Sequence, residues 1–546
     1  MNRLFATEKY LPAILAMLAG LIYLLTLAPG ITHTDSGELA TVASTLGIAH
    51  PTGYPLWTML GWLFTRIPGI PAAWLLNFMS LLFVAGSVYL FGRSLAYLFG
   101  QLRIKIKGEP KDKPSRVDLA RIFAILIGTL FFAFGRTVWA QSTTLEVYSL
   151  HTFLLNLNLY LLLRAWFAPK DQDKPWLIFA ITFALAFANH LTTVVFLPGV
   201  AWLYFSKNGF DKTAFLRIAK MLGIFFPLLI LIYAYLPLRA AAEPSYNWGN
   251  PSNFDALLHH ITGRQFQIWW FTGKEPFLEQ FGNFFKRFSN EFGYIGILIA
   301  LPGLIYSFQL RRPLAIFFLL LFLGNIFWTA NYSIKDPEPY YLLALTISTL
   351  WIALGIRWIW IRLKATRNLR YGLTGLAFAL LLLTLTLNYS AVNQRQTHQY
   401  EDYARAALSS LPPNSLVISG HWDGFVSPSY YLQGVEKFRT DIDIFEYKIM
   451  RNRHWYPHFI RVNFPEVAAH LGPRLDQWET SVQDFDLHGN VNPALLGQRF
   501  QALCFGLFEE MKNRPVYISP EMLQDDIPVP PGLVPVPERY FYRILP

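Results

Sequence analysis

The sequence predicts a mainly α-helical, polytopic membrane protein with a small C-terminal α/β extracytoplasmic domain. Of its 546 residues, 53% are hydrophobic and 15% are charged, whereas soluble domains carry about 25% charged residues. Apolar segments of about 20 residues, the length that crosses a bilayer, follow one another through the first two thirds of the chain. The rest of the chain is richer in charge and proline. These observations exclude a disordered chain and argue against an ordinary cytosolic enzyme.

About 11 membrane segments are predicted from the apolar runs. The run 176–205 is too long for one span and too short for two full ones, so we expect two short helices with Asn189 and His190 near the turn between them. The first run has no small-residue cleavage site after it, and we expect a retained anchor. Besides the two short helices of 176–205, the predicted spans are 11–29, 71–92, 121–139, 150–167, 217–236, 293–309, 313–330, 341–361 and 371–389.

The positive charge of the chain indicates topology. The formal net charge is +11, and Lys and Arg concentrate in alternate loops, above all in the segment 101–121. The loops 30–55 and 140–150 contain neither residue type. Because short basic loops stay in the cytoplasm, we expect the N-terminus inside and the C-terminus outside. The basic excess therefore needs no nucleic-acid partner.

A change in composition near residue 390 predicts two domains, a transmembrane domain over 1–390 and an extracytoplasmic α/β domain over 391–546. Short β-like runs occur in the second domain, and a helix is expected at 427–435. The β-like runs are 415–419, 441–446 and 515–519. With one cysteine, Cys504, the chain has no intramolecular disulfide and no Cys-based zinc cluster.

The first outer loop collects acids and histidines without any basic residue. Asp35 is a candidate general base, since a carboxylate there can take a proton from a hydroxyl nucleophile, and Glu38 is the second choice. The alternative is structural, because Asp35 and Glu38 have capping-box spacing and can simply begin a helix at 36–48. His50 and Tyr54 lie in a Pro-rich stretch that can likewise be only a turn.

The other predicted outer segments hold further polar residues, each with a structural alternative. Glu146 can bind substrate or begin a helix, and His190 can face a cavity or be a satisfied core histidine. Arg239 can grip a phosphate through two hydrogen bonds or extend to lipid headgroups. Asp336 and Glu338 can bind substrate or form a charged turn.

At this point the sequence resembles a known family. The segment Thr34–Trp57, TDSGELATVASTLGIAHPTGYPLW, carries its most specific motif. Supporting segments are Leu145–Phe153, Ala188–Thr193, Tyr235–Pro251 and Tyr430–Ile444. They resemble membrane glycosyltransferases of the transmembrane protein 260 (protein O-mannosyltransferase) type, within the glycosyltransferase-C (GT-C) superfamily. The resemblance covers most of the chain.

The resemblance implies a GT-C fold and the use of polyprenyl-phosphate sugars on the lumenal or periplasmic side. A carboxylate in the first outer loop serves the chemistry in that fold, which corresponds to Asp35 here. The loop has a single Asp in Asp-Ser-Gly-Glu, in place of Asp-Asp, Asp-Glu or Asp-x-Asp. We therefore expect no obligatory metal and no other cofactor.

The function expected is an inverting glycosyltransferase that moves a sugar, with mannose favoured by analogy, from a polyprenyl-phosphate donor to a hydroxyl of a protein or glycan. Arg239, and then His190 or Arg264, would bind the donor phosphate. Further substrate contacts are expected from His50, Tyr54, Glu146, Trp248, Asp336 and Glu338. The alternatives are a transporter or flippase of a lipid-linked sugar and a membrane-anchored binding protein. A bacterial plasma membrane is favoured, with the site and C-terminal domain outside, or an ER membrane with a lumenal site.

Overall fold

The computed structural model of the chain separates into two compact units, which are described one at a time. The structure describes residues 2–102, 116–292, 296–362, 367–489 and 492–546. The membrane-helix unit comprises residues 1–27, 77–231 and 268–395. The sheet unit comprises residues 28–76, 232–267 and 396–546.

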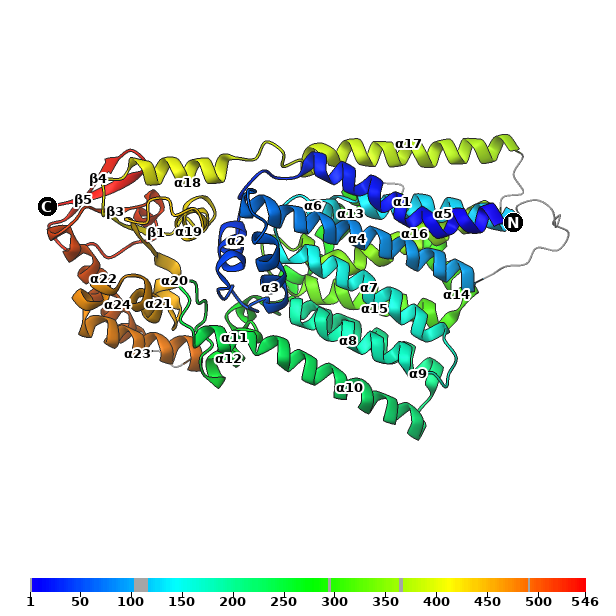
Figure 1. The fold of residues 1–546 in the computed structure, drawn as a ribbon, viewed down its shortest axis with the longest axis horizontal. Helices are drawn as coiled ribbons and strands as arrows, with labels where there is room; N and C mark the ends of the chain where they lie inside the picture. The colour runs from blue at the N-terminus through cyan, green and yellow to red at the C-terminus, as the bar shows by residue number, and fades with distance from the viewer. Residues whose placement is uncertain (1, 103–115, 293–295, 363–366, 490–491) are drawn as a thin grey trace. The chain divides into compact units, whose positions relative to one another are not determined.

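Within the described residues, every predicted membrane segment is mainly helical, and the long helices run alongside one another (Figure 1). The run 176–205 forms two helices, as predicted, with His190 between them. The helices are α1 (Asn2–Thr26), α4 (Ala72–Gln101), α5 (Arg116–Phe134), α7 (Val147–Phe167), α8 (Lys174–Asn189), α9 (Phe196–Asn208), α10 (Lys212–Tyr233), α14 (Gly296–Leu310), α15 (Arg312–Ala330), α16 (Leu342–Arg362) and α17 (Arg367–Val392).

Six helices are long and apolar enough to cross a membrane within the described residues. Their segments are Lys9–Thr26, Ala72–Gln101, Lys212–Ala240, Arg312–Ala330, Glu338–Arg362 and Thr374–Val392. Three shorter apolar helices, at Leu119–Phe134, Lys174–Asn189 and Gly296–Leu310, accompany them. The chain is therefore a multi-pass membrane protein.

Helix α16 lies at the centre of the membrane-helix unit, since 89% of the apolar stretch within Glu338–Arg362 is buried. It packs against α14, α5 and α15. Two glycines allow the closest approach: a Cβ on Gly303 would lie 1.8 Å from the Trp351 carbonyl oxygen, and one on Gly355 would lie 2.1 Å from that of Ile299. Because any side chain there would force α14 and α16 apart, this contact depends on glycine at both positions.

The sheet unit contains a five-stranded sheet in the order β2-β1-β3-β5-β4. The predicted strands are confirmed as β1 (Leu416–Ser419), β2 (Asp443–Glu446) and β3 (Val516–Ile518), which run parallel. The predicted helix is α19 (Ser427–Gly434). An antiparallel pair, β4 (Val534–Glu538) and β5 (Phe541–Leu545), was not predicted. The prolines at 535 and 537 explain the omission, because proline cannot donate to a ladder and is confined to edge strands such as β4.

Several helices surround this sheet. They are α18 (Gln399–Ser410), α20 (Tyr447–Asn452), α21 (Tyr456–Asn463), α22 (Pro465–Leu471), α23 (Pro473–His488) and α24 (Pro493–Glu509). Four helices from earlier in the sequence belong to the same unit, namely α2 (Ser36–Thr45), α3 (Pro55–Thr65), α11 (Tyr235–Ala240) and α12 (Phe254–Ile261). Whether the chain divides into domains near residue 390 stays a prediction.

The first outer loop packs directly on the C-terminal region through α2 and α19. The backbone N–H of Glu38 donates to Ser427 Oγ at 3.1 Å. A Cβ on Gly37 would lie 2.1 Å from the Ser427 carbonyl oxygen, so the first turn of α2 rests on the first turn of α19. The two segments are far apart in the sequence but adjacent in the fold.

Candidate active site

Asp35 occupies the N-cap position of α2, yet its carboxylate makes no capping hydrogen bond. Its Oδ1 accepts a hydrogen bond from the indole Nε1–H of Trp422 at 2.8 Å. Glu38 does not reach back to the N-cap either, because its carboxylate binds His50. Helix α2 therefore begins directly after Asp35, as the structural alternative expects, but without the side-chain hydrogen bonds of a capping box.

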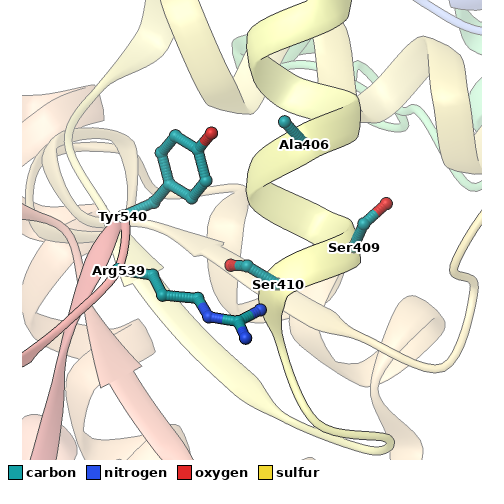
Figure 2. Close-up of a pocket in the computed structure, with 5 residues that line it drawn as sticks. All are labelled: Ala406, Ser409, Ser410, Arg539 and Tyr540. Carbon is teal, nitrogen blue, oxygen red and sulfur yellow. The ribbon is translucent and has the colours of Figure 1, made fainter.

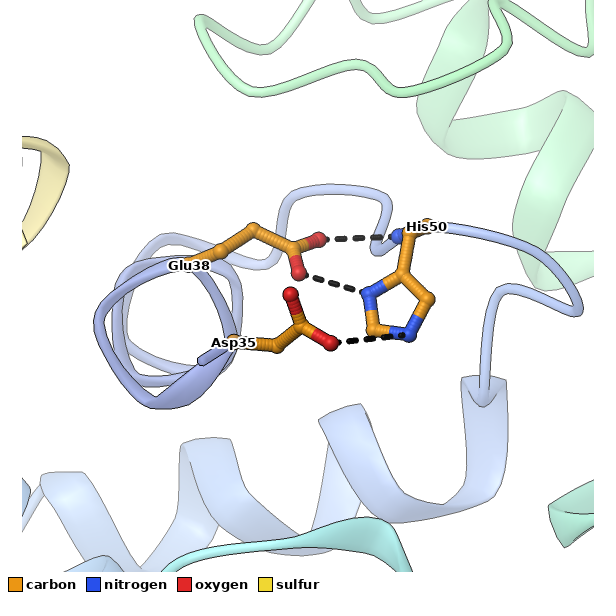
Figure 3. Close-up of side chains that lie close together, drawn as sticks. All are labelled: Asp35, Glu38 and His50. Atoms are coloured by element: carbon orange, nitrogen blue, oxygen red, sulfur yellow. Dashed lines mark hydrogen bonds and ion pairs between the residues drawn. The ribbon is translucent and has the colours of Figure 1, made fainter. Parts of the chain in front are cut away.

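Glu38 and His50 form a buried pair (Figure 3). Glu38 Oε1 accepts the backbone N–H of His50 at 2.8 Å, and Oε2 lies 2.6 Å from His50 Nδ1. Burial raises the pKa of Glu38, and the contacts with His50 oppose that rise. With Glu38 ionised, His50 carries a proton on Nδ1, which contacts Glu38, and its Nε2 is turned away from Glu38.

The second ring nitrogen of His50 faces Asp35, at 3.7 Å from Oδ2. The hydroxyl of Tyr54 also lies 3.4 Å from His50 Nε2. The Asp35 side chain is 28% exposed, whereas that of Glu38 is 3% exposed. A substrate can therefore reach Asp35, while Glu38 supports it through His50. The run from His50 to Pro55 is both a turn, closed by Gly53 N–H on the His50 carbonyl at 2.8 Å, and part of the cluster.

Aromatic rings form one wall of this cluster. The centroid of the Trp248 ring lies 5.9 Å from the ring centroid of His50, 5.6 Å from that of Trp422 and 5.1 Å from that of Trp455. Trp422 also packs edge-on against Tyr430 at 5.9 Å. Trp248 was predicted as a substrate contact, whereas Trp422 and Trp455 were missed. One signal pointed to Trp422: it closely follows the predicted strand 415–419, and ligands of parallel sheets bind beyond the carboxyl ends of the strands.

The two predicted phosphate-binding arginines of the sheet unit differ in their contacts. Arg239 Nε donates to the carbonyl oxygen of Leu46 at 2.7 Å, which ties α11 to the end of α2. Its two Nη groups make no hydrogen bond within the described residues. Arg264 is exposed at the start of a short 3₁₀ helix, Arg264–Trp269. Arg239 is thus held near the first outer loop with donors to spare.

The remaining predicted residues, Glu146, His190, Asp336 and Glu338, belong to the membrane-helix unit. Glu146 is the N-cap residue of α7 without a side-chain capping bond, and Asp336 is exposed. Glu338 forms an ion pair of 2.8 Å with Arg287, which fits its alternative as part of a charged turn.

His190 lies in a polar cluster with a histidine that was not predicted. His190 Nδ1 is 2.7 Å from Thr192 Oγ1, which lies 3.1 Å from His151 Nε2. The rings of Tyr148 and Tyr340 lie 5.1 and 5.6 Å from that of His190. His151 lies in the predicted span 150–167. A single histidine in an apolar run does not reveal its contact with Thr192, which is 41 residues away in the sequence.

Asp35, Glu38 and His50 each offer one ligand atom within 4.8 Å of the others, so the trio has the spacing to hold a metal ion. Carboxylate and imidazole ligands suit zinc and other transition metals. Both Glu38 oxygens accept hydrogen bonds from His50. A metal bound by His50 Nε2 and the carboxylates would leave the Nδ1 contact in place, because each carboxylate oxygen has a second lone pair.

A separate cavity of about 480 Å³ lies within the sheet unit (Figure 2). It is open to solvent between the end of α18 and the turn that joins β4 to β5. Its lining residues are Ala406, Ser409, Ser410, Arg539 and Tyr540. They include no carboxylate or histidine, so this lining supplies no general base for transfer to a hydroxyl.

The helices and the acid–histidine cluster define a class: a multi-pass membrane protein with the GT-C fold. The fold matches ArnT from Cupriavidus metallidurans in the apo state, with a TM-score of 0.55, 11% identity, and 99% of this chain and 98% of that chain covered. It also matches ArnT bound to undecaprenyl phosphate, with a TM-score of 0.53, 12% identity and 97% of each chain covered. The predicted fold class is confirmed.

The sequence comparisons indicate the family more closely. Residues 35–213 match the model of the protein O-mannosyl-transferase TMEM260 N-terminal domain. The chain is 24% identical to protein O-mannosyl-transferase tmem260 of Dictyostelium discoideum over 88% of its length. It is 26% identical to TMEM260 of Mus musculus over 82% of its length. The chain spans 63% of the length of each of these relatives. The resemblance to the TMEM260 type is confirmed.

Proposed function

We propose that the chain is an inverting glycosyltransferase that moves a mannosyl group from a polyprenyl-phosphate donor to a Ser or Thr hydroxyl of an acceptor protein. The observation that carries the proposal is the exposed Asp35 carboxylate, which Trp422 holds and His50 faces, with Glu38 buried behind. The named relatives are protein O-mannosyl-transferases, and one protein of the same fold was solved with undecaprenyl phosphate.

Asp35 Oδ2 is the atom that takes the proton, because Oδ1 already accepts the Trp422 N–H. As the acceptor oxygen loses its proton to Oδ2, it forms a bond to the anomeric carbon of the sugar. The bond from that carbon to the phosphate oxygen breaks, and its electron pair leaves on the polyprenyl phosphate. Attack opposite the phosphate inverts the configuration. The indole N–H of Trp422, 2.8 Å from Oδ1, keeps the carboxylate in place for this step.

The leaving phosphate gains negative charge and needs donors, which are the groups that accelerate such reactions most. We assign Arg239 this role first, because its Nη groups are uncommitted, and His190 or Arg264 next. Tyr54 and Trp248 would contact the sugar, with Trp248 offering a ring face. Glu146, Asp336 and Glu338 are proposed as further substrate contacts. Glu338 would make its contact while paired with Arg287.

We further propose that the reaction needs no obligatory metal. The reasons are that the first outer loop has a single Asp in Asp-Ser-Gly-Glu, and that Glu38 already has His50 as its partner. Transfer should be unchanged by an excess of EDTA. Loss of transfer with EDTA, restored by Mn²⁺ or Zn²⁺, would make Asp35, Glu38 and His50 metal ligands.

The site is proposed to face the extracytoplasmic side, in line with the distribution of Lys and Arg among the loops. The membrane is the plasma membrane of a bacterium, or the ER membrane with a lumenal site. The expected partners are the lipid-linked sugar, an acceptor protein or glycan, and the bilayer.

The test is transfer of labelled mannose from a synthetic polyprenyl-phosphate mannose to a Ser/Thr acceptor peptide by the full chain in detergent. Asp35→Asn keeps an acceptor for the Trp422 N–H but removes the base, and should lower kcat by about 10²–10⁴-fold. Asp255→Asn, an exposed acid in the first turn of α12, is the matched control and should not change it.

Normal transfer by folded Asp35→Asn would refute the base assignment. If the wild-type chain transfers no sugar but moves the labelled lipid across proteoliposomes, the protein is a flippase and the proposed transfer is wrong.

A further inference from the structure

A second charged cluster lies in the sheet unit and is almost fully buried. The side chain of Asp486, on α23, is 4% exposed. Its Oδ2 lies 2.7 Å from His454 Nδ1 and also accepts the His454 backbone N–H at 3.1 Å. Arg453 Nη1 donates to Oδ1 at 3.0 Å. A buried carboxylate is costly unless it is paired and fully hydrogen-bonded, so this arrangement is strongly determined.

The other nitrogen of the His454 ring points to the loop that carries Trp248. His454 Nε2 lies 3.2 Å from the carbonyl oxygen of Gly249. A carboxylate and a carbonyl are both acceptors, so both ring nitrogens must carry hydrogens to make both bonds. The His454 ring thus joins the Asp486 carboxylate to the backbone of the loop that carries Trp248.

Gly249 is fixed from its other side by His260. Its φ is +75°, and a Cβ there would lie 2.3 Å from His260 Nδ1, so the backbone fits between the two histidines only as glycine. Burial lowers the pKa of His260 to about 3, which keeps that ring neutral. The preceding residue, Trp248, donates its backbone N–H to the Ile48 carbonyl at 3.2 Å. The contacts of the Gly249 carbonyl and of the Trp248 backbone N–H thus hold both ends of the peptide unit that carries the Trp248 ring beside His50.

We propose that His454, held by Asp486, is a positioning residue that keeps the Trp248–Gly249 segment against His50. In this role the C-terminal region sets the aromatic wall of the candidate active site as well as holding Asp35 through Trp422. The link to catalysis rests on the proposed function, whereas the positioning of the loop does not.

Two other groups face the Asp486 carboxylate. Arg453 Nη1 donates to Oδ1, and His259 Nε2 lies 3.8 Å from the same oxygen. Burial lowers the pKa of His259 to about 4, which keeps that ring neutral.

Two substitutions separate the two bonds of the imidazole. His454→Gln places an amide N–H near the position of Nε2 and keeps the bond to Gly249. His454→Asn places it near Nδ1 and keeps only the bond to Asp486. His470→Asn is the matched control. His470 also lies close to an acid, since its Nε2 is 3.6 Å from Glu509 Oε2. Its side chain is a third exposed, and it is far in sequence from the Trp248–Gly249 segment.

The measurement is hydrogen–deuterium exchange of the segment 245–251 in the full chain, as protection factors at neutral pH. In His454→Asn we expect protection to fall about fivefold, the worth of one hydrogen bond, and in His454→Gln to stay within twofold of wild type. Equal protection in wild type and His454→Asn would overturn the proposal.

Sugar transfer by the same variants tests the catalytic link. His454→Asn should lower kcat/KM about fivefold at neutral pH, His454→Gln should restore most of it, and His470→Asn should match wild type. Altered exchange with unaltered transfer in His454→Asn would overturn the link to catalysis. If the wild type transfers no sugar, the proposed function fails, and the exchange data still decide whether His454 positions the loop.

Discussion

The histidine clusters around His50 and His190, taken from different units, differ in what surrounds the imidazoles. In the sheet unit, His50 lies between the carboxylates of Glu38 and Asp35. In the membrane-helix unit, His190 and His151 meet at the hydroxyl of Thr192. The first cluster places an imidazole between two carboxylates, one 2.6 Å and the other 3.7 Å away. The second has a hydroxyl at its centre, which supplies no charge.

The difference suggests a division of labour. A histidine next to a carboxylate can support proton transfer, because the imidazole keeps a favourable partner in either protonation state. Two neighbouring imidazoles disfavour a positive charge on each other unless an anion is supplied. We therefore expect substitutions in the His50 cluster to lower the rate of the chemical step, and those in the His190 cluster to weaken binding of the phosphate-bearing donor.

The largest effect on this comparison is expected from Glu38→Gln. A glutamine has one acceptor oxygen, whereas Glu38 accepts both the N–H and the Nδ1–H of His50, so the ring loses its orientation. We expect kcat at saturating donor and acceptor to fall roughly 10²–10³-fold. Glu243→Gln, at an exposed acid of the same unit, is the control. A kcat for Glu38→Gln within threefold of wild type would show that His50 needs no carboxylate behind it.

Glu446 shows how burial acts on the pKa of an acid, apart from the effect that His50 has on the pKa of Glu38. It is a buried acid at the end of β2 whose carboxylate caps α20. Burial raises its pKa from 4.5 to about 7. Between those values the folded state binds the proton more tightly than the unfolded state does, so stability falls as pH rises.

The expected loss is about 3 kcal/mol of unfolding free energy between about pH 4.5 and pH 7. Glu446→Gln should flatten the dependence of the thermal unfolding midpoint over this range, because the amide does not titrate. Glu466→Gln, at an exposed acid on α22, should leave the slope unchanged. A slope in Glu446→Gln equal to that of wild type would assign the pH dependence to other groups.

The helices could be predicted from the sequence because an apolar run of bilayer length is a local property. The split of 176–205 followed from its length and from basic residues on both flanks. The β4–β5 pair could not be predicted in the same way, since Val534–Glu538 contains two prolines and pairs only at the edge of the sheet.

For the site, the sequence predicted what lies close together in the chain. Asp35, Glu38 and His50 fall within one loop, and the structure brings them into contact. Trp422 contacts Asp35 across a separation of 387 residues, and His454 contacts Gly249 across 205. No local pattern marks such pairs, because they exist only once the C-terminal region has packed on the loops that carry Asp35 and Gly249.

A smaller effect, and one of a different kind, is expected in the membrane-helix unit. His190→Ala should raise the KM for the polyprenyl-phosphate donor about tenfold, a loss that matches one hydrogen bond to a charged group, while kcat stays within threefold. Thr192→Val should act in the same direction, because it removes the hydroxyl that joins His190 to His151.

The matched control is Thr182→Val, which removes a hydroxyl bonded to Asn158 at 2.9 Å between α7 and α8. It should leave the donor KM unchanged. If His190→Ala lowers kcat as strongly as Glu38→Gln does and leaves the donor KM alone, the proposed division of labour between the two clusters is wrong.

The smallest predicted effect concerns the contact that joins the C-terminal region to Asp35. Trp422→Phe keeps an aromatic ring beside Trp248 but removes the N–H that binds Asp35 Oδ1 at 2.8 Å. We expect kcat to fall about fivefold, since one hydrogen bond to a carboxylate is lost while the base itself remains. Trp478→Phe loses the same kind of bond, to the Met450 carbonyl at 3.2 Å. It should lower the thermal unfolding midpoint and leave the kcat of the folded protein within twofold. Equal kcat values for the two variants would mean that Trp422 serves the packing of the C-terminal region and not the orientation of the base.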